Sequence, residues 1–175
     1  WETWVEMKEK FPYFGATLAV HDMSRTIHPR AVEAYPDMTL TNKPLQVGGV
    51  LEFYRSIDVL LSTSRGEGNN KPAMEFLATG GPVIASDWSG HQNWLHDDCC
   101  WRLPGVLAPI SEGDLASDFR VDVATLEKTL LDVAASPSTV AKKAAAARPW
   151  VTSVLSWDRV AGDMEETLQK VLAAA

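Results

Sequence analysis

The sequence predicts an α/β fold in which a mostly parallel β-sheet carries helices on both faces. Two observations indicate this class. Segments typical of strands alternate with segments typical of helices along the chain. The strand-like segments are also continuous apolar runs, such as residues 57–62 and 82–86, rather than alternations of apolar and polar residues. Continuous runs are typical of strands that are buried on both faces, as they are in a parallel sheet covered by helices.

The first half of the chain supplies the start of this alternation. Apolar residues at helical spacing end at Pro12, and Pro44 with Gly48-Gly49 marks a loop. The run over 57–62 is the clearest buried strand. The elements expected here are a helix over 1–11, a strand over 16–20, a weak helix over 29–35, a strand over 38–41, a helix over 50–56 and the strand over 57–62.

The second half continues the pattern and then becomes helical. Pro72 and Gly80-Gly81 bracket a short helix, with Pro at its start and Gly after its end. Residues 105–120 show no clear period, so we expect an irregular loop there. Pro137 and Pro149 are expected to break the helices that follow. The elements expected here are a helix over 72–79, a strand over 82–86, a turn or short helix over 89–95, a strand over 99–103, and helices over 123–134, 138–148 and 156–172.

Composition and charge exclude several classes of protein. The length of 175 residues suits one domain. The net charge of −7 argues against binding to a nucleic-acid backbone, which needs clustered Lys and Arg. No apolar run approaches the roughly 20 residues of a membrane-spanning helix, so we expect no membrane span. The chain opens inside a helical pattern with no initiator Met or signal peptide, which indicates a fragment of a longer protein.

The cysteines and histidines do not predict a metal site. Cys99 and Cys100 are adjacent, and such a pair builds neither a disulfide framework nor a zinc site. We interpret them as reduced thiols of a cytoplasmic protein. His28, His91 and His96 lack metal-ligand spacing, so no metal is expected.

The segment 65–75 combines three features that favour a ligand carrying both phosphate and hydroxyl groups. It follows a buried strand, where α/β folds place ligands, and it enters a helix whose first amides attract an anion. Gly66 and Gly68 permit close backbone approach. Glu67 and Glu75 supply carboxylates that accept hydrogen bonds from a sugar or ribose.

Each of these residues also has a simpler interpretation. Glu67 would then be a solvated loop acid, and Glu75 an acid favoured by the helix dipole. Lys71 and Arg65 would be surface charges, and His91 a turn residue rather than a donor contact. Context decides between the two interpretations, because a motif gains weight only inside the structure it requires.

That context resembles a known family. The stretch Tyr54 to Gly90, YRSIDVLLSTSRGEGNNKPAMEFLATGGPVIASDWSG, holds Glu67 and Glu75 seven residues apart, followed by Gly81-Pro82-Val83-Ile84. It resembles the C-terminal domain of the GT-B retaining glycosyltransferases of family four, also called glycosyl transferases group 1. Ser156-Trp157-Asp158 is similar to the start of that family's closing helix. The resemblance implies a Rossmann-like three-layer αβα sandwich, the C-terminal half of a GT-B fold.

The resemblance also implies a role for each site residue. Glu67, the catalytic candidate, would contact the hydroxyls of the donor sugar, and Glu75 would bind the nucleotide ribose. The other donor-binding candidates are Arg65, Gly68, Asn69, Asn70, Lys71 and His91, with Thr41, Asn42 and Lys43 near the base. The substrate would be a UDP- or GDP-sugar, with no cofactor and no metal, and the hexose would be transferred with retention of configuration.

The chain departs from the family at three positions. Asn69 and Asn70 stand where an aromatic residue and Gly are common, and Asn93 stands where Glu is usual. Asn tolerates left-handed dihedral angles better than most residues, so we expect the turn to survive.

The domain organisation follows from the same resemblance. Residues 1–175 would be one donor-binding domain with a closing helix over 150–175, and its first strand and the N-terminal acceptor domain would precede Trp1. The alternatives are a non-catalytic nucleotide-sugar-binding module, and a GT-B epimerase or phosphorylase.

Overall fold

The computed structural model of the chain describes residues 2–11, 14–21, 35–41, 43–111 and 116–173. These residues form two compact units. The first comprises Trp1–Asp58 with Val123–Pro137, and the second comprises Val59–Asp122 with Ser138–Ala175. Both units combine helices with parallel strands, which confirms the α/β class.

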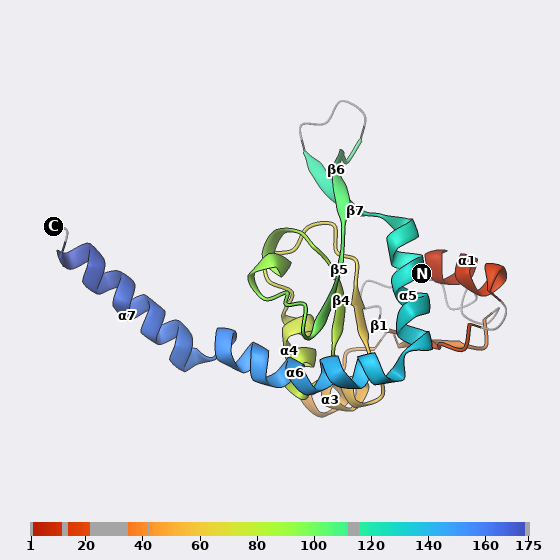
Figure 1. Ribbon diagram of the computed structural model, residues 1–175, viewed down its shortest axis with the longest axis horizontal. Helices are drawn as coiled ribbons and strands as arrows, with labels where there is room; N and C mark the ends of the chain where they lie inside the picture. Colours follow the sequence, from red (N-terminus) through yellow and green to blue (C-terminus); the bar gives the residue numbers. More distant parts are fainter. Residues whose placement is uncertain (1, 12–13, 22–34, 42, 112–115, 174–175) are drawn as a thin grey trace. The chain divides into compact units, whose positions relative to one another are not determined.

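The first unit holds a two-stranded parallel sheet. Strand β1 pairs with β2 in a register that runs from Leu18 opposite Met38 to His21 opposite Thr41. A cluster of buried apolar side chains, Trp4, Met7, Phe14 and Met38, forms its core. The elements are α1 (Glu2–Lys10), β1 (Leu18–His21), β2 (Met38–Thr41), α3 (Val47–Arg55) and α5 (Val123–Ala135), several of which are labelled in Figure 1. The weak helix expected over 29–35 lies, except for Tyr35, outside the described residues.

The second unit is built on a three-stranded parallel sheet in the order β3-β4-β5. Its strands are β3 (Leu60–Ser62), β4 (Val83–Ser86) and β5 (Cys100–Leu103). All four residues of β4 are buried, as expected for a central strand in a continuous apolar run. Strand β3 is shorter than the expected 57–62, but its position and its parallel pairing with β4 agree with the prediction.

Helix α4 (Lys71–Thr79) connects β3 to β4, and its ends follow the expected asymmetry. Asn70 caps the N-terminus in the left-handed conformation, with φ 56° and ψ 65°. Gly80 caps the C-terminus with φ 94°. Since Ala73, Phe76 and Leu77 are buried, the helix turns one face to the core and leaves Glu75 on the exposed face.

The described part of 105–120, residues 105–111 and 116–120, is not the irregular loop that we expected. They hold an antiparallel hairpin of β6 (Gly105–Pro109) and β7 (Ser117–Val121), labelled in Figure 1. Most of its side chains are exposed, including Val106 at 66% and Leu107 at 52%, whereas Phe119 is buried. Val106 and Leu107 point to opposite faces of β6 and both are exposed, so this strand carries no one-sided apolar pattern that periodicity could reveal.

Pro149 does not end a helix, which corrects a second expectation. Helix α6 (Pro137–Leu155) continues through it. Proline removes one backbone hydrogen bond there. The neighbouring Trp150 holds this part of the helix in place. Its Nε1 donates to the Trp94 carbonyl over 2.9 Å, and its ring stacks on the His96 ring with centroids 4.0 Å apart.

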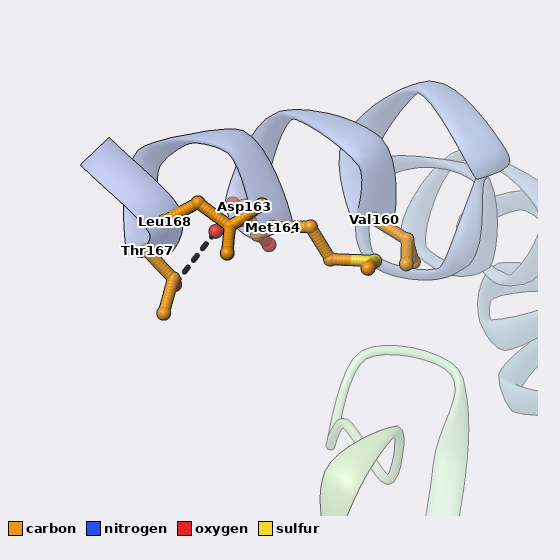
Figure 2. Close-up of a pocket in the computed structure, with 5 residues that line it drawn as sticks. All are labelled: Val160, Asp163, Met164, Thr167 and Leu168. Atoms are coloured by element: carbon orange, nitrogen blue, oxygen red, sulfur yellow. Dashed lines mark hydrogen bonds between the residues drawn. The ribbon is translucent and has the colours of Figure 1, made fainter. Parts of the chain in front are cut away.

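Helix α7 (Trp157–Ala173) has no buried residue. Its first turn is capped by Ser156, whose Oγ accepts from the amide of Arg159 over 3.3 Å. Figure 2 shows a shallow groove on this helix, lined by Val160, Asp163, Met164, Thr167 and Leu168. Among the described residues, no helix is long and apolar enough to cross a membrane.

Candidate functional site

The predicted site lies on the β3–α4 loop (residues 63–70), which leaves the carboxyl end of β3 and enters α4. Glu67 is half-buried there, and its Oε2 accepts a hydrogen bond from Ser64 Oγ over 3.3 Å. The strand, loop and helix that the motif requires are therefore all present.

The loop is tied from one side to the η1 turn (Ser89–Asn93), a short 3₁₀ segment after β4. The Glu67 carbonyl accepts from the Gly90 amide over 3.0 Å and from Ser89 Oγ over 2.9 Å. The two backbones meet so closely that a Cβ on Gly90 would lie 2.0 Å from the Gly68 carbonyl oxygen. Glycine is therefore required at position 90 for the contact.

Further hydrogen bonds extend this attachment along the loop. Ser86 Oγ donates to the Ser64 carbonyl over 2.9 Å, at the start of the loop. Trp94 Nε1 donates to the Asn69 carbonyl over 2.8 Å, near its end. Because both carbonyls are held from β4 and the residues that follow it, the loop has one fixed side and one side exposed to solvent.

The exposed side carries groups suited to an anion. Gly68, Asn69 and Lys71 are exposed, and their amides have no hydrogen-bond partner within the described parts of the chain. The start of α4 adds the positive end of a helix dipole. Pro72 lacks an amide and the Ala73 amide is capped by Asn70, so the free donors lie just before the helix and at its first residue.

Glu75 lies one turn into α4 on its exposed face. It has an interaction of its own within the protein, so a ligand would share or replace that interaction. The two acids lie on the same loop–helix segment, and their use by one ligand stays a prediction. The grooves on α7 and beside Phe11, Phe14 and Leu131 contain neither acid.

Arg65 is engaged by the hairpin rather than free. Its Nη1 lies 3.1 Å from Asp118 Oδ2, and its carbonyl accepts from the Phe119 amide over 2.9 Å. The Phe119 ring stacks on Trp88 with centroids 5.5 Å apart. These hairpin residues were missed by the sequence prediction, because the segment 105–120 was expected to be irregular.

Asp118 forms the ion pairs at this contact. Its Oδ1 lies 3.1 Å from Arg120 Nε, so two guanidinium groups flank one carboxylate. Burial alone would raise the pKa of Asp118, but the hydrogen bonds and charges of Arg120 and Arg65 outweigh it and hold that pKa below its usual value.

His91 does not lie where a ligand could reach its ring. The side chain is fully buried, and both ring nitrogens have partners in the protein. The direct donor contact that we expected for His91 does not fit this placement. Asn70 is also buried, with 8% of its surface exposed, so at most its backbone is offered to a ligand.

The residues expected near the base belong to the first unit. Thr41 ends β2, and the Lys43 carbonyl accepts from His21 Nε2 over 3.2 Å. Asn42 lies outside the described residues. Within the described part of the chain, no group of three or more His, Cys, Asp or Glu side chains is placed to hold a metal ion.

Comparison with known proteins identifies the fold. No protein-family model and no curated protein matches the chain. Among solved structures, it is similar to a sucrose-phosphate synthase from Thermosynechococcus elongatus, with a TM-score of 0.67 and 19% identity over 99% of this chain and 42% of that one.

Two further solved structures are similar to the chain in fold. The C-terminal domain of a glycosyl transferase group 1 family protein (LpcC) from Francisella tularensis matches with a TM-score of 0.60 and 18% identity, over 87% of this chain and 75% of that one. Anabaena Alr3699/HepE, solved in complex with UDP, matches with a TM-score of 0.67 and 10% identity, over 97% and 44% of the two chains.

The class of fold follows from these matches. The chain has the Rossmann-like α/β fold of the C-terminal domains of GT-B glycosyltransferases. It spans 42% of the length of the synthase and 44% of the length of the Anabaena protein.

Proposed function

We propose that the chain is the nucleotide-sugar-binding domain of a retaining glycosyltransferase of family four. The observation that carries the proposal is the β3–α4 loop. One of its sides is fixed to the protein, and the other offers amides beside Glu67 that have no partner among the residues that the structure describes. The fold and the UDP bound to the Anabaena protein support the same class of ligand.

In this proposal each group acts on one part of a UDP- or GDP-hexose. The diphosphate lies at the amides of Gly68, Asn69 and Lys71, where the helix dipole stabilises the negative charge that develops on the leaving group. The Glu67 carboxylate accepts hydrogen bonds from sugar hydroxyls, and the Ser64 hydroxyl orients it. Glu75, one turn further on, accepts from the ribose hydroxyls.

Two smaller assignments belong to the proposal. The leaving diphosphate is stabilised by protein amides and cations, with no metal ion required. Cys99 and Cys100 are free thiols, which fits the cytoplasm as the proposed location.

Calorimetric titration with UDP and with GDP tests the ribose assignment. Glu75→Ala is expected to weaken binding at least about tenfold, because a hydrogen bond to a charged group is lost. Glu165→Ala, which removes an exposed acid on α7, is the matched control and should bind like the parent. Equal affinity of Glu75→Ala and the parent would refute the assignment.

The sugar assignment needs a different comparison. Glu67→Gln keeps the size of the side chain but removes its charge. It should weaken binding of the UDP- or GDP-sugar more than binding of UDP or GDP alone, because its proposed partner is the sugar. If the affinities for both ligands fell by the same factor, the assignment of Glu67 to the sugar would be wrong.

A further inference from the structure

A buried polar network behind the β3–α4 loop has no role in the proposed chemistry. It centres on Asn70, the left-handed residue between loop and helix. The Asn70 side-chain amide donates to Ser62 Oγ over 2.7 Å and to His91 Nε2 over 2.8 Å. Its Oδ1 accepts from the Ala73 amide over 3.3 Å. Every polar atom of this side chain is therefore used.

The hydrogen bonds of His91 determine its protonation. Its Nδ1 lies 2.8 Å from the Ser86 carbonyl oxygen, which can only accept, so Nδ1 carries the proton. Its Nε2 faces the Asn70 NH₂ group, which can only donate, so Nε2 is unprotonated. The ring is thus neutral in one defined tautomer, and it is packed edge-on to Trp94 with centroids 5.2 Å apart.

The network links three elements that the site needs. Ser62 ends β3, Ser86 ends β4, and Asn70 is the N-cap of α4. His91 lies in the η1 turn and forms hydrogen bonds to both Asn70 and Ser86. Since Asn70 directly follows Gly68 and Asn69, its fixed orientation sets the direction of the exposed amides.

We propose that Asn70 and His91 act as a pair of positioning residues for the β3–α4 loop. The inference rests on the proposed function, because the loop is where that function places the nucleotide sugar. Neither side chain touches the ligand. The neutral His91 ring holds Asn70, and Asn70 fixes the backbone that presents Glu67 and the free amides.

Two variants isolate the pair. Asn70→Gly retains the left-handed backbone and removes the side-chain hydrogen bonds. His91→Phe retains a buried ring and removes both nitrogens. Val151→Ala, at a buried position of α6, serves as the stability control. It should lower the free energy of unfolding, and Val151 takes no part in the hydrogen bonds of the network.

Amide hydrogen exchange measures the loop directly and needs no ligand. The reporters are the Gly90 amide and the Trp94 indole N–H, which bond to the Glu67 and Asn69 carbonyls. Exchange at both should be about tenfold faster in Asn70→Gly and His91→Phe, as expected for loss of a buried hydrogen bond. Parent-like exchange in both variants would overturn the inference, as would a protonated Nε2 in the ¹⁵N spectrum of His91.

Nucleotide titration then connects the loop to the site. Both variants should bind UDP or GDP about tenfold more weakly than the parent, whereas Val151→Ala should bind normally. The double variant should be no weaker than either single one, because both changes break one linkage. Faster exchange with parent-like affinity would overturn the positioning role. A parent that binds neither nucleotide would refute the proposed function, and the exchange result would then decide whether the pair positions the loop.

Discussion

The guanidinium of Arg65 and the carboxylate of Asp118 form an ion pair of 3.1 Å that joins the β3–α4 loop to strand β7. The hairpin therefore lies against the candidate site. Because Arg120 binds the other oxygen of Asp118, this single carboxylate connects two cations on different segments. The observed role of Arg65 is therefore structural: its ion pair holds the β3–α4 loop to the hairpin.

Removing the charge at position 118 should weaken this connection in a pH-dependent way. The folded-state pKa of Asp118 is lowered, so its stabilising effect is present above the unfolded pKa of about 3.9 and is lost as the pH falls through the lower folded value. Asp118→Asn should therefore melt below the parent at pH 7, and the difference should shrink below about pH 4.

Thermal unfolding from pH 3 to pH 7 measures this effect. Asp163→Asn, which removes an exposed pair with Arg159 on α7, is the control and should change little. A difference between Asp118→Asn and the parent that stays constant over this pH range would contradict the assignment.

The close contact at Gly90 predicts a clear difference between two glycines. A Cβ at position 90 would lie 2.0 Å from the Gly68 carbonyl oxygen and 2.8 Å from that of Glu67. Gly90→Ala should therefore push the loop away, destabilise the protein by about 1–3 kcal/mol and weaken nucleotide binding. Nothing lies within 4 Å of a Cβ at Gly66, so Gly66→Ala should fold normally. Denaturant titration of both variants checks this, and equal stabilities would contradict it.

Phe119 should contribute to the packing between the hairpin and the residues that follow β4. It is 5% exposed, and its ring stacks on Trp88 with an interplanar angle of 2°. Phe119→Ala should cost up to about 3 kcal/mol and should change the fluorescence of Trp88. Phe119→Leu keeps apolar volume and should cost less. An unfolding free energy that is unchanged in Phe119→Ala would show that the hairpin is held by its ion pair and backbone alone.

The sequence was informative where one-dimensional signals reflect burial or local turns. The apolar run over 82–86 predicted β4, and Pro72 and Gly80 predicted the two ends of α4; the structure confirms both elements. The expectation that Asn in place of Gly allows this turn is also confirmed, and the residue that adopts the left-handed conformation is Asn70, with a φ of 56°.

Tertiary contacts explain what the sequence did not reveal. The hairpin of β6 and β7 depends on backbone pairing between exposed segments, which leaves no periodic signal. The place of His91 depends on Asn70, Ser86 and Trp94 converging on one ring, and no local pattern reports that convergence. In the sequence, a histidine that follows Ser89-Gly90 in a turn resembles a surface residue.

Pro149 offers a test of how packing overrides local preference. An interior proline costs a helix about 3 kcal/mol, through a lost hydrogen bond and a steric clash. Helix α6 nevertheless continues, since Ala147 and Val151 are buried on either side and Trp150 is anchored to the Trp94 carbonyl. Pro149→Ala restores the amide, so it should raise the free energy of unfolding by about 1–2 kcal/mol after the greater entropy of the unfolded chain is subtracted. Pro137→Ala is the matched control, because proline is favourable at the first position of a helix and its removal should bring no gain. If denaturant titration finds Pro149→Ala less stable than the parent, then the proline ring itself contributes to the packing around Trp150.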